Sequence, residues 1–116
     1  MTDEKRFAIG DKAEKLYFKV FDVTTDRKHY PIKYNRLVKR LQDTSLDIYG
    51  FLTDANSSEK QERYKLQTQG ITRCNQLASL LKYSLHAKLI SAATCEELID
   101  LVHDVKFMSL AWRKVT

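Results

Sequence analysis

The sequence has few of the residues that interrupt helices, with three glycines and one proline among 116 residues. Proteins built from many short strands need these residue types in their tight turns, so the composition argues against a β-sheet protein. It favours a few long helices joined by short loops. The length suits a single domain, 1–116, with one hydrophobic core.

Long apolar runs are also missing. No stretch approaches the roughly 18–20 apolar residues that span a bilayer. The first residues, Met-Thr-Asp-Glu-Lys-Arg, are charged and lack the apolar segment of a secretory signal. We therefore expect a soluble, cytoplasmic protein with no membrane partner.

The motifs of common enzyme classes are absent from the sequence. It has no glycine-rich phosphate loop, G-x-S-x-G, H-E-x-x-H or Cys/His/Asn set. His29, His86 and Cys95 are the best case for a zinc site, but no two of them have a local ligand spacing. Asp100 and His103 form one Asp-x-x-His, whereas a di-metal site in a bundle needs two Glu-x-x-His motifs. We expect no catalytic residues, no metal and no cofactor.

Four segments have apolar residues at steps of three and four, which is the period of an amphipathic helix. In the clearest of them, 34–56, the stripe consists of Val38, Leu41, Ser45, Ile48, Leu52 and Ala55. In the third segment the predicted inner row is Gln67, Ile71, Cys74, Ala78, Leu81 and Leu85. The predicted helices cover about 11–26, 32–55, 59–89 and 94–114. Gly50 costs the second helix about 1 kcal/mol relative to alanine, which we interpret as a sign of a close helix contact there.

Local signals mark the boundaries of these helices. Asp11 and Ser58 are each followed three residues later by Glu or Gln, which is the capping-box pattern. Pro31 suits the first turn of the second helix. Ser91 or Thr94 is expected to cap the fourth helix, and Thr94 also begins a capping box.

Four such helices joined by short loops predict an all-α fold, an up-down-up-down antiparallel four-helix bundle. In this topology Cys74 lies about fifteen residues before the end of the third helix, and Cys95 lies at the matching end of the fourth. At about 1.5 Å per residue the two cysteines are roughly 20 Å apart along the bundle. That separation is too long for a disulfide, so we expect two reduced core cysteines.

Positive charge is concentrated in two segments. Residues 27–42 hold six lysines and arginines and residues 65–93 hold four, with no acid in either segment. The topology brings the start of the second helix and the end of the third to one end of the bundle, partly offset by Glu96 and Glu97. The predicted basic cap consists of Arg27, Lys28, Lys33, Arg36, Lys39, Arg40, Lys82 and Lys88. Such segregation favours an acidic partner, either nucleic acid or an acidic protein face, although a solvated helix surface gives the same pattern.

The chain has more aromatic residues than four helices are able to bury. Phe18, Tyr34 and Phe51 are the candidates for a subunit interface. Tyr30 and Tyr34 lie among basic residues, where they could stack on unpaired bases, although packing between helices is the ordinary role of such residues. The spacing of the other aromatic residues, Tyr83 among them, places them mostly in the core.

Several positions form a distributed pattern that covers nearly the whole chain. It consists of Ile9-x-x-Lys12-Ala13-Glu14-x-Leu16-Tyr17, then Pro31, then Arg36-Leu37-x-x-Arg40-Leu41-Gln42-Asp43, and later Asp104-Val105-Lys106-x-x-x-Leu110-Ala111-Trp112-Arg113. This pattern resembles that of the bacterial four-helix-bundle proteins related to the accessory variability determinant, which are accessory proteins of diversity-generating retroelements. Related stand-alone bundles of unknown role also occur, some of them encoded within ribosomal-RNA intervening sequences.

The resemblance implies a basic, barrel-like homopentamer that binds the retroelement reverse transcriptase and its template RNA or complementary DNA (cDNA). It also implies that the protein has no catalytic residues of its own. The nucleic-acid-binding candidates that it implies are Arg36, Lys39, Arg40, Arg73, Lys82, Lys88, Arg113 and Lys114. The alternative is a protein-interaction or scaffolding bundle of a mobile element that makes no direct contact with nucleic acid.

Overall fold

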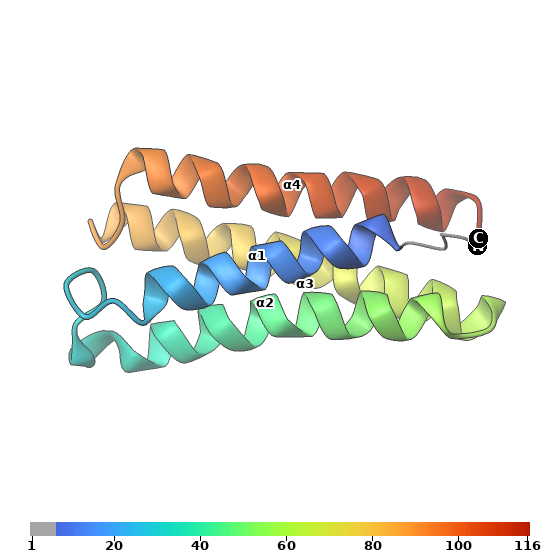
Figure 1. The fold of residues 1–116 in the computed structure, drawn as a ribbon, viewed down its shortest axis with the longest axis horizontal. Coiled ribbons are helices and arrows are strands. Elements are labelled where there is room, and N and C mark those ends of the chain that lie inside the picture. Colours follow the sequence, from blue (N-terminus) through green and yellow to red (C-terminus); the bar gives the residue numbers. More distant parts are fainter. Residues whose placement is uncertain (1–6) are drawn as a thin grey trace.

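The computed structural model describes residues 7–116, and these residues form four long helices (Figure 1). The elements are α1 (Ala8–Thr24), a short 3₁₀ helix η1 (Ile32–Tyr34), α2 (Asn35–Asn56), α3 (Lys60–His86) and α4 (Ala92–Lys114). No strand occurs among the described residues. The predicted all-α class is therefore confirmed.

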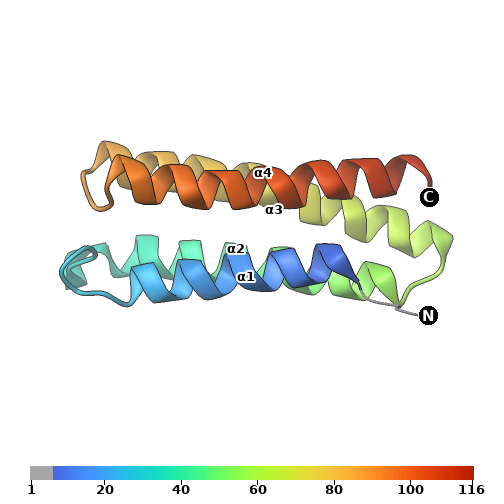
Figure 2. The ribbon, with the colours of Figure 1, turned by 45° about the horizontal axis from the view of Figure 1, so that its top comes forward.

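The four helices form two layers. Figure 2 shows α1 beside α2 in one layer and α3 beside α4 in the other. Both α2 and α4 pack against α1 and α3, so each helix contacts two neighbours around the bundle. The connections 25–34, 57–59 and 87–91 are short, and short connections make consecutive helices antiparallel. The up-down-up-down bundle is thus the one that the sequence predicts.

The core is built from the apolar stripes of all four helices. Its fully buried leucines are Leu16, Leu41, Leu52, Leu77, Leu81 and Leu98, and each such side chain contributes about 1.5–3 kcal/mol of burial free energy. The predicted stripe of α2 is buried from Leu41 to Ala55. In α3, however, Leu85 is 38% exposed and does not belong to the inner row. The reason is that the buried row steps by three from Leu81 to Ser84, which leaves Leu85 one position off the inner row.

The first helix begins four residues earlier than its capping pattern predicts. Its N-cap is Phe7, so the assignment of Asp11 as the N-cap is wrong. The Phe7 ring packs edge-on against Trp112 with centroids 5.2 Å apart, and Ile9 is buried. Because of this apolar contact with α4, the helix begins before Asp11, the residue that the capping-box pattern marks. Residues 1–6 of the predicted frayed lead-in lie outside the described part of the chain.

The third and fourth helices also differ from the prediction at their ends. Glu59, not Ser58, is the N-cap of α3 and makes no side-chain cap, because the Ser58 hydroxyl donates instead to the Asp54 carbonyl oxygen at 2.6 Å. Helix α3 ends at His86, and Lys88 adopts a left-handed backbone with φ of 61°. Ser91 caps α4 by accepting the Thr94 backbone N–H at 3.0 Å, so the capping box that begins at Thr94 is not used.

The close helix contact lies at a different glycine from the one predicted. A Cβ atom on Gly50 would meet nothing within 4 Å, so the interpretation of this residue is wrong. At Gly70 of α3, by contrast, a Cβ atom would lie 2.8 Å from Cδ2 of Leu52 in α2. The absence of a side chain at Gly70 therefore lets α3 approach α2 closely.

Both cysteines are buried and free, as predicted. Burial raises the pKa of the Cys74 thiol to about 12, so this group stays protonated at neutral pH. Burial also raises the pKa of Cys95, although nearby Lys82 opposes the shift. None of the helices in the described part is long and apolar enough to cross a membrane.

Candidate nucleic-acid interface

The bundle brings eight of the eleven predicted cations to one end. At this end α1 stops, α2 starts, α3 stops and α4 starts (Figure 1). We call this region the basic end and define it by Arg27, Lys28, Lys33, Arg36, Lys39, Arg40, Lys82 and Lys88. The remaining three cations are separate from it: Arg73 lies midway along α3, and Arg113 and Lys114 lie at the opposite end of the bundle.

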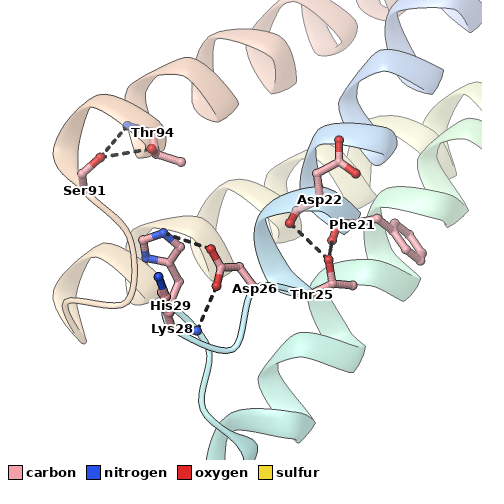
Figure 3. A network of polar contacts seen from close by, with 8 residues as sticks. All are labelled: Phe21, Asp22, Thr25, Asp26, Lys28, His29, Ser91 and Thr94. Atoms are coloured by element: carbon pink, nitrogen blue, oxygen red, sulfur yellow. Dashed lines mark hydrogen bonds and ion pairs between the residues drawn. The ribbon is translucent and has the colours of Figure 1, made fainter.

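The connection between α1 and α2 holds two of these cations in an ordered turn. Asp26 accepts the Lys28 backbone N–H at 2.9 Å, and its carboxylate lies 3.6 Å from Nε2 of His29 (Figure 3). Tyr30 follows this turn, and its fully buried side chain packs in the core and so anchors the turn. Arg27 donates to the Asn35 side-chain oxygen at 2.8 Å. The turn therefore presents Arg27 and Lys28 at the surface on a fixed backbone.

The first turns of α2 form a second basic group. Arg36, Leu37, Lys39, Arg40 and Asp43 line a surface hollow of about 410 Å³. Lys39 forms an exposed ion pair with Asp43 at 3.0 Å, one turn along the helix. Within the described residues, Arg36 and Arg40 have no carboxylate within ion-pair distance. Their two guanidinium groups are consequently available to an anionic ligand.

Acids of α1 and α4 lie at the same end of the bundle. Glu97 forms an ion pair with Lys19 of α1 at 2.8 Å and is thereby neutralised. Glu96 has no cationic partner among the described residues. Asp22, exposed in the last turn of α1, likewise has no cationic partner among the described residues, so two unpaired carboxylates accompany the cations of the basic end.

Two of the three separate cations, Arg73 and Arg113, make local contacts within the bundle. Arg73 lies 3.6 Å from the Asp47 carboxylate and over the Phe51 ring. Arg113 donates to the Thr68 hydroxyl at 3.0 Å and lies over the Tyr64 ring. These contacts tie the arginines to neighbouring helices and give them a packing role of their own.

The aromatic residues are placed differently from the prediction. Tyr30 has no exposed surface and is unable to stack on a base, so of the two roles considered for it, packing between helices is the one that it has. Tyr34 is half-buried, with the Lys33 ammonium over its ring at 5.4 Å. The interface candidates are unequal, since Phe18 is 52% exposed whereas Phe51 is half-buried beneath Arg73.

One aromatic residue near the basic end is exposed although the sequence predicts that it is buried. Tyr83, assigned to the core by spacing, is 51% exposed and lies on the outer side of α3. Its ring centroid is 6.1 Å from that of His86. The signal was present in the sequence, because Tyr83 is two residues after the buried Leu81 and so falls off the inner row.

The part of the chain that the structure describes contains no group of three His, Cys, Asp or Glu side chains that could hold a metal ion. His29 and His86 are both exposed, and Cys95 is buried against the Leu81 carbonyl oxygen. The sequence-level zinc candidates therefore do not converge on one point.

Comparison with known proteins identifies the fold. No protein family matches the sequence, and no curated protein matches it. A solved protein of unknown function from the S23 ribosomal protein family of Bacteroides thetaiotaomicron is similar in structure, with a TM-score of 0.81. The match covers 91% of this chain and 98% of that one at 9% sequence identity. At this identity the likeness shows the four-helix fold and carries no function.

Proposed function

We propose that this protein is a non-catalytic accessory subunit that binds RNA or cDNA through its basic end. The observation that carries this proposal is the charge at that end, where eight cations gather against two carboxylates without an ion-pair partner among the described residues, those of Asp22 and Glu96. A reverse transcriptase of the diversity-generating retroelement type is the proposed protein partner. The partner and a homopentameric assembly are proposed from the sequence resemblance alone.

Phosphate contacts explain how such a surface would work. Each lysine or arginine that neutralises a phosphate releases a condensed counterion, so affinity falls steeply as salt rises. Arg36 and Arg40 sit one turn apart on a rigid helix and are not engaged by carboxylates of the described residues. They are therefore the strongest candidates for phosphate contacts, and Lys39 joins them when its pair with Asp43 opens.

Replacing Arg36, Lys39 and Arg40 together by glutamine tests the proposal. We expect the slope of log affinity against log salt to become shallower by about two to three, because each lost contact removes about 0.7–0.9. The measurement is fluorescence anisotropy of a labelled structured RNA at several salt concentrations. Stability should change little, since all three side chains are exposed.

A matched control removes the same charge elsewhere. Lys60, Lys65 and Lys114 are exposed and lie at the opposite end of the bundle. Their triple glutamine variant has the same net charge as the first variant and should keep nearly the wild-type slope. Equal slopes in the two variants would mean that binding follows net charge, and the assignment to the basic end would be wrong.

A second candidate function is a protein-interaction bundle without nucleic-acid contact. It is favoured by large apolar side chains on the surface, with Phe18 52% and Phe107 60% exposed. Apolar groups of this size are enriched where subunits or partners meet. On this alternative the basic end is a solvated surface, and the triple variant at Arg36, Lys39 and Arg40 changes no specific interaction.

A further inference from the structure

Two neighbouring rings lie on the outer surface of α3 beside the basic end. Tyr83 and His86 are one turn apart, and their ring centroids are 6.1 Å apart with planes inclined at 43°. Tyr83 is 51% exposed and His86 is exposed as well. The bundle thus leaves roughly half of a tyrosine uncovered in the last turn of a long helix.

The surroundings of this ring pair are basic. Lys82 precedes Tyr83 in the chain, and Lys88 follows two residues after His86. The pairing of Arg73 with Asp47 and the contact of Gly70 with Leu52 set the register between α3 and α2. In this antiparallel register Arg36 and Arg40 of α2 lie level with about residues 80–86 of α3. Cations therefore lie on both helices at the height of the rings.

No other tyrosine at this end offers a comparable surface. Tyr30 is fully buried, and Tyr34 is half-buried with the Lys33 ammonium over its ring. An exposed aromatic face beside a track of cations is the arrangement that proteins use for unpaired bases, since each base stacks on a ring while phosphates lie on lysine and arginine.

We propose that Tyr83, together with His86, is a stacking platform for an unpaired base whose flanking phosphates lie on the basic end. This inference rests on the proposed function and narrows its ligand to nucleic acid with a single-stranded segment. A blunt duplex keeps its bases stacked inside the helix and offers phosphates, 2′-hydroxyls and base edges to such a surface, but no base face along its length. The platform therefore adds affinity for a single strand and not for a duplex.

The test compares two RNA probes, a single-stranded oligouridylate and a blunt duplex, by fluorescence anisotropy at low salt. Replacing Tyr83 by leucine should weaken single-strand binding roughly five- to hundredfold, which corresponds to the loss of one base–aromatic stack. Duplex binding should stay near the wild-type value. Tyr83→Phe keeps the aromatic face and should bind the single strand like the wild type.

Tyr64 provides a matched control on the same helix. It is 52% exposed, almost the same as Tyr83, but lies at the opposite end of α3. Tyr64→Leu should leave both probes unaffected. If Tyr83→Leu behaves like Tyr64→Leu, or weakens duplex and single strand equally, the stacking platform is overturned while the proposed function stands. If the wild type binds neither probe at low salt, the proposed function itself has failed.

A spectroscopic readout separates stacking from a structural role. Tyr83→Trp places an indole at the platform, and a base stacked on it should quench fluorescence beyond the change seen for Trp112 in the wild type. Quenching by the oligouridylate and not by the duplex supports the inference. Binding of the single strand with no added quenching contradicts it, since the ring would then lie outside the contact.

Discussion

Lys88 occupies a backbone position that usually belongs to glycine. Its φ of 61° follows directly on the end of α3, where the Leu89 N–H donates to the Ser84 carbonyl oxygen and the Lys88 N–H donates to Leu85, both at 2.9 Å. This is the Schellman pattern, in which glycine is the common residue because it has no Cβ to clash. A lysine held in this conformation at the basic end suggests that its charge matters more there than the strain that it costs.

Lys88→Gly should therefore separate stability from binding. We expect the free energy of unfolding to rise by about 0.5–1 kcal/mol as the left-handed strain is relieved. RNA binding should weaken at the same time, with a salt slope shallower by about one. Urea titration measures the first effect and anisotropy the second. Asparagine adopts the same left-handed backbone but carries no charge, so Lys88→Asn should show the same weaker RNA binding. Unchanged RNA binding in both variants would show that Lys88 does not contact the RNA.

The α2–α3 contact depends on a glycine that the sequence pattern does not single out. Gly50 and Gly70 both interrupt long helices, and each costs about 1 kcal/mol in helix propensity. The structure separates them, since the site of Gly50 is open and that of Gly70 faces the fully buried Leu52. Only the second glycine sets how closely two helices approach.

Alanine at these two positions should have opposite effects. Gly50→Ala should stabilise the protein by about 0.5–1 kcal/mol, because the new Cβ meets no neighbour. Gly70→Ala should destabilise it, because overpacking against Leu52 costs about 1–3 kcal/mol and exceeds the gain in propensity. Thermal unfolding followed by circular dichroism compares the two variants under one condition. Stabilisation by alanine at both positions would show that helix propensity alone decides, and that α3 is free to move away from α2.

At the scale of the whole molecule, the two candidate functions differ in whether the assembled protein binds RNA. A bundle with its apolar stripe already buried has no need of a second copy for its own core, so an oligomer must use its outer surface. Phe18 is the most exposed of the predicted interface residues, whereas Tyr34 and Phe51 are half-buried within the chain. If copies of the chain associate through the predicted interface residues, Phe18 is the one whose exposed apolar surface the association would bury.

Light scattering coupled to size exclusion tests this expectation. We expect a mass of about five times the 13.6 kDa of one chain. The protein should also bind a structured RNA at low salt and release it as the salt concentration rises. Phe18→Ser should lower the mass, whereas Phe107→Ser, which removes a similarly exposed ring from α4, should not. A stable oligomer indifferent to RNA at all salt concentrations would favour the scaffolding function. A monomer indifferent to RNA would contradict the nucleic-acid-binding function and leave only a protein-interaction bundle that binds a different protein.

The sequence alone determines the architecture of this protein. Helix periodicity and the scarcity of glycine and proline predict four helices, and the short loops predict their antiparallel order, because these are local properties of the chain. The same order places eight cations at one end without any knowledge of side-chain contacts. The last residues of α2 and α4 lie within one residue of the predicted 55 and 114, and the cysteines are free and buried as predicted.

Only the tertiary structure decides the details on which the proposed site depends. It buries Tyr30, exposes Tyr83, pairs Glu97 with Lys19 and moves the close helix contact from Gly50 to Gly70. Each of these outcomes depends on which residue of another helix lies at the same height and angle, and periodicity within one helix carries no information on that. A stripe of apolar residues predicts that one face of a helix is buried. Which side chains at the edges of that face are buried depends on the neighbouring helix.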